Sequence, residues 1–386
     1  MSNSSGSPRA GLLPYGRQSV DEDDVQAVAR VLRSDWLTTG PMVEEFERAF
    51  AAFTGTAHAV AVSNGTAALH AAMAALGIGP GDEVIVPAIT FVATANAVVY
   101  QGGTPVFADI DPGTLLIDPE AVRRLITPRT RAIAAVDYAG QPCDYAALRA
   151  IAREHNLALV ADACHALGGA DHGHPVGTLA DLSTFSLHPV KPIATGEGGM
   201  IVTDRADLAA RLRVFRNHGI TTDHRQREKQ GAFFYEMTEL GYNYRLSDIH
   251  CALGLSQLRK LPAWVRRRQE IAASYDRAFA SQPAIQPLVT RSGVSHGYHL
   301  YVVRLAPHLD RAAIFQALRA ESIGTNVHYL PVYLHPFYRE KLGLSAGLCP
   351  QAEAAYARIL TLPLFPTMTD TDVQDVIAAV VRVTSR

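Results

Sequence analysis

Short apolar segments alternate with helix-like segments from residue 59 to residue 203, and this alternation restricts the possible folds more than any other feature. Each apolar segment has the length of a strand, and Ala- and Leu-rich helical patterns lie between them. The predicted strands are Ala59–Val62, Glu83–Val86, Pro105–Ala108, Ala132–Val136, Leu157–Ala161, Leu182–Ser186 and Met200–Thr203. Such alternation indicates βα units. We therefore expect an α/β fold with a mainly parallel central sheet flanked by helices.

The pattern changes after Asp204. Pro262 has no backbone N–H, so it is expected to separate two helices, Ser247–Lys260 and Ala263–Phe279. The rest of the chain predicts strands at His299–Leu305 and Asn326–Tyr329, and helices at Arg311–Ser322, Ala352–Leu360 and Asp370–Val381. A chain of 386 residues is too long for one ordinary core. We therefore predict a disordered tail over residues 1–12, a large domain over residues 13–260 and a small C-terminal α+β domain over residues 261–386.

The charge and the cysteines exclude several classes of protein. A formal net charge of -2 provides no basic surface for nucleic acid or an anionic membrane. No run of 18 apolar residues suggests a membrane span, and the Ser- and Gly-rich start lacks the apolar core of a signal peptide. The four cysteines have no CxxC or CxxH spacing, so neither a zinc site nor a disulfide framework is expected. These features predict a cytoplasmic protein with no metal, nucleic-acid or membrane partner.

Lys191 differs from the other lysines of the chain in its surroundings. Lys229, Lys260 and Lys341 stand beside charged residues, as solvated surface lysines do, whereas Lys191 lies in an apolar segment interrupted by Pro and Gly. Burial there would lower the pKa of its amine, which makes it a candidate for forming an imine. The segment by itself is also consistent with a loop lysine that has no chemical role.

A phosphate site is predicted near the start of one helix. In open parallel sheets, ligands bind beyond the carboxyl ends of the strands. Gly65 and Thr66 follow the strand at Ala59–Val62 and open a helix, where free amides and the positive helix end can hold a phosphate. A plain helix N-cap explains the same residues equally well. Ser186 ends a later strand and reaches the same edge of the sheet.

Ionisable side chains are expected at this edge too. Asp162 ends an apolar strand, and an unpaired buried carboxylate costs several kcal/mol, so it should have a cationic or donating partner. An ordinary structural ion pair would satisfy it. His165 follows three residues later, close enough to line the same pocket, unless it is a satisfied core histidine. His188 lies between a predicted strand and Lys191.

Pyridoxal phosphate accounts for all of these residues together. This cofactor needs a lysine for its imine, a carboxylate that keeps its ring nitrogen protonated, and donors for its phosphate. The imine lysine would be Lys191, the carboxylate would be that of Asp162, and the phosphate donors would come from the segment containing Gly65 and Thr66. Once an incoming amine releases Lys191, the lysine is left to act as a proton shuttle.

Several longer motifs occur in order along the chain. They read Ser-Asn-Gly-Thr-Ala-Ala-Leu, Pro-Ala-Ile-Thr-Phe-Val-Ala-Thr-Ala-Asn, Asp-Ala-Cys-His-Ala-Leu-Gly and Phe-Ser-Leu-His-Pro-Val-Lys-Pro-Ile-Ala-Thr-Gly-Glu-Gly-Gly. They resemble the motifs of the DegT/DnrJ/StrS-type nucleotide-sugar aminotransferases, and the resemblance runs from Leu13 to the C-terminus. It implies the type I aspartate-aminotransferase fold, pyridoxal 5'-phosphate as cofactor and a homodimer.

The resemblance also implies roles for single residues. Lys191 matches the Schiff-base lysine, and Asp162 matches the partner of the pyridinium nitrogen, so these two are the expected catalytic residues. Asn243 matches the residue that reaches the cofactor phosphate of the neighbouring subunit, so each site would need both chains. The expected cofactor-binding residues are Gly65, Thr66, Phe91, Asp162, His165, Ser186, Lys191 and Asn243. Among them, Phe91 would stack on the cofactor ring and His165 would lie beside the ring oxygen.

One branch of the family, that of pseudaminic acid biosynthesis, is the most similar. Its members transfer an amino group from L-glutamate to C4 of a UDP-linked 4-keto-6-deoxy-N-acetylhexosamine. The resemblance rests on Val-Asp-Tyr-Ala-Gly-Gln, on Asn-Val-His-Tyr-Leu-Pro-Val-Tyr and on Pro192 after the lysine. It implies substrate contacts at Tyr15, Leu37, Thr38, His188, Asn326, His328 and Tyr329. The pair Asp35-Trp36 stands where a relative has a Lys-Gln pair, so the UDP contact there is expected to differ.

Other functions fit parts of the same sequence. An aminotransferase acting on a UDP- or dTDP-4-keto sugar of different stereochemistry would need the same cofactor residues. A family dehydratase has His in place of the imine lysine, and Lys191 argues against it. A pyridoxal-phosphate-binding regulator would need a DNA-binding module, and no basic helix-turn-helix stretch is evident.

Overall fold

Seven strands of the described residues form one sheet in the order β1-β9-β8-β5-β4-β2-β3. The structure is a computed structural model that describes residues 11–222, 224–229 and 231–385. The strands are β1 (His58–Val62), β2 (Glu83–Pro87), β3 (Thr104–Ala108), β4 (Thr130–Val136), β5 (Ala158–Asp162), β8 (Leu182–Ser186) and β9 (Gly199–Thr203). β9 runs antiparallel to β1 and β8, and the other neighbours pair in parallel. The predicted α/β class is therefore confirmed.

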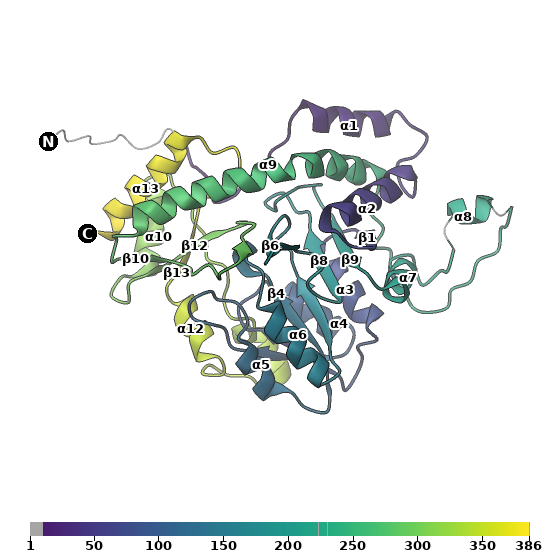
Figure 1. The fold of residues 1–386 in the computed structure, drawn as a ribbon, viewed down its shortest axis with the longest axis horizontal. Coiled ribbons are helices and arrows are strands. Elements are labelled where there is room, and N and C mark those ends of the chain that lie inside the picture. The colour runs from purple at the N-terminus through teal and green to yellow at the C-terminus, as the bar shows by residue number, and fades with distance from the viewer. Residues whose placement is uncertain (1–10, 223, 230, 386) are drawn as a thin grey trace.

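Helices lie on both faces of this sheet (Figure 1), so its strands are buried on both sides. This explains why the strands read as continuous apolar runs and not as alternating ones. The helices of this part are α1 (Glu22–Leu32), α2 (Pro41–Thr54), α3 (Gly65–Ala75), α4 (Ala93–Tyr100), α5 (Pro119–Leu125), α6 (Tyr145–Glu154), α7 (Ala206–Phe215) and α8 (His224–Lys229), with a 3₁₀ turn, η1 (Tyr138–Gly140). The side chain of Asn64 caps α3 by accepting a hydrogen bond from Ala67 N.

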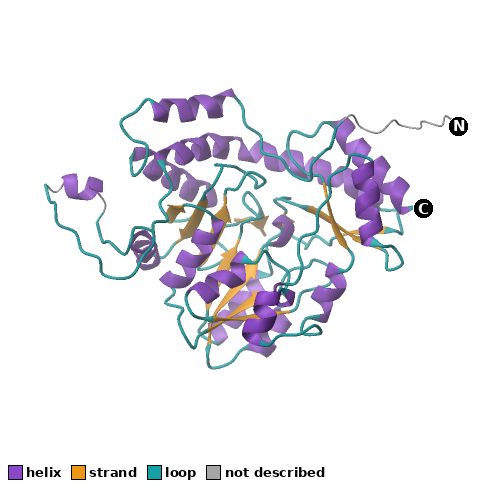
Figure 2. Cartoon of the chain, turned by 180° about the vertical axis from the view of Figure 1, so that it is seen from behind, coloured by secondary structure: helices purple, strands orange, loops and turns teal. Residues whose placement is uncertain are grey.

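The C-terminal third of the chain builds a smaller antiparallel sheet with its own helices (Figure 2). The sheet has the order β10 (Ile285–Pro287), β12 (Tyr301–Leu305), β13 (Ile359–Leu362). A separate sheet of three short strands has the order β11 (Val294–Ser295), β6 (Ala170–Asp171), β7 (His174–Pro175), so it joins this part of the chain to the preceding one. The helices are α10 (Arg311–Ala320), α11 (Pro336–Leu342), α12 (Pro350–Tyr356) and α13 (Asp370–Thr384), with a 3₁₀ turn, η2 (Val332–Leu334). A second hydrophobic cluster, which includes Leu13, lies here.

One long helix, α9 (Asp248–Phe279), connects the two hydrophobic clusters. The prediction of two helices separated by Pro262 is wrong, because Pro262 lies inside α9. A proline in a helix interior costs about 3 kcal/mol. The buried side chains of Leu261 and Val265 on either side of Pro262 pack into the larger cluster and offset that cost. Of the helices that the structure describes, neither α9 nor any other is long and apolar enough to cross a membrane.

Two other predicted elements differ from the structure. The strand predicted at Asn326–Tyr329 is wrong, since this segment makes a single bridge, between Asn326 and Thr361. The helix predicted at Ala352–Leu360 ends at Tyr356, because the residues from Ile359 onward pair with β12 as strand β13. The division at residue 260 falls within α9 and stays a prediction. Residues 1–10 of the predicted tail lie outside the described residues.

Gly254 provides a test of how α9 packs on α2. A Cβ atom at Gly254 would lie 2.5 Å from Cζ of Phe46, which is fully buried on α2. Replacing a helical glycine by alanine ordinarily gains about 1 kcal/mol. We predict that Gly254→Ala instead lowers the free energy of unfolding by about 1–3 kcal/mol, because the added methyl group overpacks the contact with Phe46. Denaturant unfolding followed by circular dichroism measures this change.

A compensating substitution provides the control. Phe46→Leu shortens the opposing side chain, so the double variant should recover part of the stability that Gly254→Ala loses. A stabilised Gly254→Ala variant would contradict the packing described here.

Candidate active site

A cavity of about 580 Å³ opens at the carboxyl ends of β5 and β8 and at the start of α3. Most of the residues predicted as a site line it together: Tyr15, Gly65, Thr66, Phe91, Asp162, His165, Ser186, His188, Lys191, Asn326, His328 and Tyr329. They come from segments as far apart in sequence as residues 15 and 329, so the fold itself assembles this set.

Three predicted site residues lie outside this cavity. Leu37 is half exposed and its carbonyl accepts a hydrogen bond from Asp248 N, and Thr38 forms a bridge with Ser247. Asn243 is exposed and forms a bridge with Asn217. Their predicted roles in binding substrate and the neighbouring cofactor therefore stay predictions.

Lys191 lies in the loop that joins β8 to β9. Backbone hydrogen bonds from Leu187 N to Gly198 O and from Thr195 N to Leu187 O close this loop, and a further one from Lys191 N to His188 O shapes the turn at Lys191. Burial lowers the pKa of the Lys191 amine below its ordinary value, although Cys164 and Asp162 act in the opposite direction. The side chain is thus held in a place that favours its uncharged, nucleophilic form more than solvent does.

Asp162 ends β5 and its side chain is 6% exposed. Thr94 Oγ1 donates a 2.7 Å hydrogen bond to Asp162 Oδ2, and Cys164 N donates a 3.3 Å hydrogen bond to Oδ1. Thr94 in turn shares a 2.8 Å hydrogen bond with Thr90. The donating partner that a buried carboxylate needs is therefore chiefly the hydroxyl of Thr94.

His165 is buried beside Asp162 and Lys191 and stays uncharged. Burial lowers the pKa of its imidazole well below its ordinary value, and the nearby Lys191 and His328 lower it further. Its Nε2 lies 3.3 Å from the hydroxyl of Tyr329, whereas its Nδ1 has no partner among the described residues. An imidazole nitrogen thus remains free to bond a ligand.

The start of α3 approaches the end of β8 closely. A Cβ atom at Gly65 would lie 2.8 Å from Cβ and 3.1 Å from Oγ of Ser186, so a larger side chain would force these segments apart. The amides of Gly65 and Thr66 belong to the first turn of α3, which has no intrahelical acceptors. With the hydroxyls of Thr66 and Ser186 in the same cavity, this corner matches the donors that a phosphate requires.

The residues present fit pyridoxal phosphate. The desolvated amine of the half-buried Lys191 and the buried carboxylate of Asp162 face one cavity, and the helix start at Gly65 offers donors for a phosphate. The ring of Phe91 is 55% exposed and lines the cavity, as a residue that covers a flat ring would.

Sequence reasoning missed two residues of this site. Thr94 lies within the motif Thr-Phe-Val-Ala-Thr, but nothing in the motif shows that its hydroxyl bonds Asp162. His299 was predicted only as the start of a strand, yet it lines the cavity beside Lys191. A histidine within an apolar run that starts a strand is the one signal that could have drawn attention to it.

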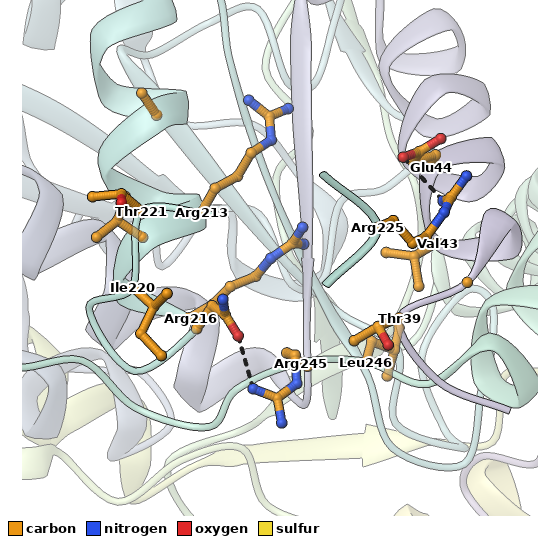
Figure 3. Close-up of a pocket in the computed structure, with 14 residues that line it drawn as sticks. Thr39, Val43, Glu44, Arg213, Arg216, Ile220, Thr221, Arg225, Arg245 and Leu246 are labelled. Carbon is orange, nitrogen blue, oxygen red and sulfur yellow. Dashed lines mark hydrogen bonds and ion pairs between the residues drawn. The ribbon is translucent and has the colours of Figure 1, made fainter. Parts of the chain in front are cut away.

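A second cavity, of about 290 Å³, lies between α2, α7 and the segment around Leu246 (Figure 3). Its lining includes four arginines: Arg213, Arg216, Arg225 and Arg245. Arg225 pairs with Glu44 at 3.1 Å, Arg245 donates a 2.9 Å hydrogen bond to Asn217, and Arg216 bonds Glu47. The cavity contains none of the predicted cofactor-binding residues, so the chemistry is assigned to the cavity at Lys191.

Residues 18–381 match the DegT/DnrJ/EryC1/StrS aminotransferase family, and the chain belongs to it. The chain is 43% identical over 378 residues to the spore coat polysaccharide biosynthesis protein SpsC of Bacillus subtilis, covering 96% of this chain and 97% of that protein.

Solved structures of related aminotransferases are similar to this chain over nearly its whole length. The PLP-form of the putative sugar aminotransferase Spr1654 from Streptococcus pneumoniae superposes with a TM-score of 0.91 at 32% identity, over 97% of this chain and 99% of that chain. Helicobacter pylori PseC, an aminotransferase involved in the biosynthesis of pseudoaminic acid, superposes with a TM-score of 0.91 at 33% identity, over 97% and 99% of the two chains.

These findings confirm the predicted family, the type I fold and the cofactor. Aminotransferases of this family depend on pyridoxal phosphate, and the chain is one of them. The sugar aminotransferases among the solved relatives cover nearly the whole chain, so the similarity is not confined to one domain.

Covalent attachment tests the assignment of Lys191. We predict that incubating the protein with pyridoxal phosphate and then reducing it with borohydride attaches a pyridoxyl group to Lys191, because this amine is the one held in the cavity. Peptide mass spectrometry locates the modification. The matched control is Lys341→Ala, which removes an exposed lysine and should leave the labelling unchanged. Stoichiometric labelling that survives Lys191→Ala would contradict the assignment.

Proposed function

We propose that this chain transfers the amino group of L-glutamate to C4 of a UDP-linked 4-keto-6-deoxy-N-acetylhexosamine. The substrate would be UDP-2-acetamido-2,6-dideoxy-β-L-arabino-hex-4-ulose. The product would be UDP-4-amino-4,6-dideoxy-N-acetyl-β-L-altrosamine, an intermediate of pseudaminic acid biosynthesis. The observation that carries the proposal is that Lys191 and Asp162 share one cavity with the polar wall formed by Tyr15, Asn326 and His328.

Each part of the cavity has a chemical task in this proposal. Pyridoxal phosphate supplies an aldehyde that links to amines and a protonated ring that takes up the electron pair left when a C–H bond breaks. Asp162, whose carboxylate accepts a hydrogen bond from Thr94, would hold the ring nitrogen and keep it protonated. Lys191 carries a proton between carbon atoms with Nζ as base and then acid. Gly65, Thr66 and Ser186 hold the phosphate in place.

The wall opposite the sheet suits a hydroxylated ring. His328 Nδ1 shares a 2.8 Å hydrogen bond with Thr361, and Asn326 lies 3.4 Å from Nε2 of His328. The ring of Tyr15 lies 5.3 Å from the ring of His328. Such a set of amide, imidazole and phenol groups can donate and accept hydrogen bonds, as the hydroxyl groups of a sugar require. Leu37 and Thr38 are proposed to contact the nucleotide, and His188 to contact the sugar.

A second substrate has independent support. The chain is 43% identical in sequence to SpsC, a spore coat polysaccharide biosynthesis protein, and 33% identical to PseC. An aminotransferase for a different UDP- or dTDP-4-keto sugar would use the same cofactor residues and differ in the wall around Asn326 and His328. The nature of the sugar is therefore the point that an experiment must decide.

A panel of UDP- and dTDP-4-keto sugars, each supplied with L-glutamate, tests the substrate. We expect the β-L-arabino 4-keto sugar to give the highest kcat/KM, with 2-oxoglutarate and a C4 amino sugar formed in equal amounts. Mass spectrometry and NMR of the products identify the sugar and the position of its amine. Asn326→Ala should lower kcat/KM about tenfold or more, because a hydrogen bond to the sugar is lost. A higher kcat/KM for a dTDP sugar would overturn the UDP assignment and leave the aminotransferase class intact.

We further propose that the protein acts as a homodimer with shared active sites. The segment 232–242 projects from the body of the molecule (Figure 1) and carries exposed apolar side chains, among them Phe233 at 92% and Leu240 at 77% exposure. Apolar side chains gathered in this way mark an interaction surface. Asn243, which directly follows the segment, is exposed and lies outside the cavity of its own chain, and it would complete the cavity of the second copy.

Mixing two inactive variants tests the shared site. Lys191→Ala and Asn243→Ala chains, unfolded together and refolded, should regain about a quarter of the wild-type activity, because each mixed dimer has one complete site. Lys191→Ala mixed with Asp162→Asn should regain none, since both residues belong to the same chain's cavity. Light scattering gives the oligomeric state. A fully active Asn243→Ala chain, or equal recovery in both mixtures, would contradict the shared site.

A further inference from the structure

His299 stands directly beside Lys191 in the cavity. Its Nε2 lies 3.5 Å from Lys191 Nζ, a long hydrogen bond, and its side chain is 5% exposed. It comes from the segment that leads into β12 of the smaller sheet, whereas Lys191 follows β8 of the larger one. The contact therefore joins the two parts of the molecule at the reacting amine.

The backbone holds His299 in place from two sides. Gly297 N bonds Gly140 O at 2.8 Å, and Leu300 N bonds Ala139 O at 3.0 Å. At Gly140, where φ is +110°, a Cβ atom would lie 2.9 Å from His299 N, so only glycine allows this approach. The backbone on both sides of His299 is thus fixed, and its buried ring reaches Lys191 from a defined position.

The unpaired nitrogen of His299 indicates which ring nitrogen carries the proton. Nδ1 of His299 is buried and has no partner among the described residues. A neutral imidazole has one N–H and one lone pair, and a buried N–H without an acceptor is rarer in proteins than an acceptor without a donor. The proton therefore belongs on Nε2, which faces Lys191.

A donor at Nε2 decides the state of the amine. An ammonium group has three N–H donors and no lone pair, so it cannot accept a hydrogen bond from His299. An uncharged amine has a lone pair and can accept this hydrogen bond. We propose that His299 is a positioning residue that donates its Nε2–H to the lone pair of Lys191 Nζ and thereby holds this amine uncharged and oriented.

The surroundings of both groups are consistent with this arrangement. The titratable and charged groups around them are Asp162, Cys164, His165, Arg268 and His328. Burial is the main cause that lowers the pKa of His299 well below its ordinary value, so the imidazole stays neutral. The guanidinium of Arg268, a residue 2% exposed on α9, donates to the carbonyls of Tyr298 and Leu364, and its charge further lowers the pKa of His299.

The inference rests on the proposed role of Lys191 but can be measured without the reaction. The full-length protein, freed of cofactor, is labelled with trace acetic anhydride between about pH 6 and 11, and mass spectrometry compares Lys191 with exposed Lys341. His299→Phe removes the donor and keeps a ring. The midpoint of the pH profile for acetylation of Lys191 should rise by about one pH unit in this variant. At pH values below that midpoint, the acetylation rate of Lys191 should therefore fall about tenfold.

Two matched variants separate positioning from packing. His299→Gln retains an N–H donor and should keep a midpoint close to that of the wild type. His296→Phe changes a buried histidine of the same segment that stacks on Tyr298 instead of facing Lys191, and should shift nothing. A lower midpoint in His299→Phe would mean that Lys191 donates to His299. That result, or an unchanged midpoint, would overturn the proposal.

A measurement on the unaltered protein covers the case in which His299→Phe fails to fold. Nitrogen-15 NMR of histidine-labelled protein, with the His299 signals assigned by their loss in His299→Gln, reports which ring nitrogen carries the proton. The proposal requires an Nε2–H tautomer, and an Nδ1–H tautomer or a charged ring would overturn it. If borohydride fails to attach pyridoxal phosphate to Lys191, the proposed function fails, whereas these readouts stand unaffected.

Discussion

The burial of an amine and a carboxylate at one edge of the sheet is the constraint on which the rest of this structure depends. Asp162 and Lys191 are placed there by two adjacent parallel strands, β5 and β8, whose carboxyl ends lie side by side. Each group costs free energy when it leaves water, and each has neighbours that reduce that cost. For Asp162 the neighbour is the hydroxyl of Thr94, and for Lys191 it is the uncharged ring of His299.

The larger sheet and the segments around it supply most of the cavity but not all of it. Asp162, Ser186 and the start of α3 come from this part, whereas His299, Asn326 and His328 come from the C-terminal part of the chain. α9 passes through both hydrophobic clusters, and the backbone bonds between η1 and the segment before β12 fix one part against the other. A site assembled in this way depends on both cores being packed, so loosening either one would move the groups around Lys191.

Local patterns account for what could be predicted from the sequence. Apolar runs with intervening helices are local features, so they predict the parallel sheet, and Gly65 and Asp162 lie at the edge where the pattern puts them, while their roles stay predictions. Pro262 was misjudged because the packing of its neighbours outweighs its local preference, and β13 was missed because it depends on pairing with a distant strand. Thr94 and His299 were missed since their roles arise from contacts over 68 and 108 residues of sequence.

The residues proposed to hold the cofactor and the residues proposed to bind the sugar come from different parts of the chain. The residues proposed to hold and activate the cofactor lie mostly at the carboxyl ends of the strands of the larger sheet and on the segments that follow them. A change in Asp162 or Lys191 there would remove the chemistry altogether. The polar wall around Asn326 and His328 lies on a segment without regular secondary structure, joined to β13 by the bridge between Asn326 and Thr361. Such a segment can change its side chains without disturbing a sheet. A family with one cofactor and many sugars is what this division of the cavity would permit.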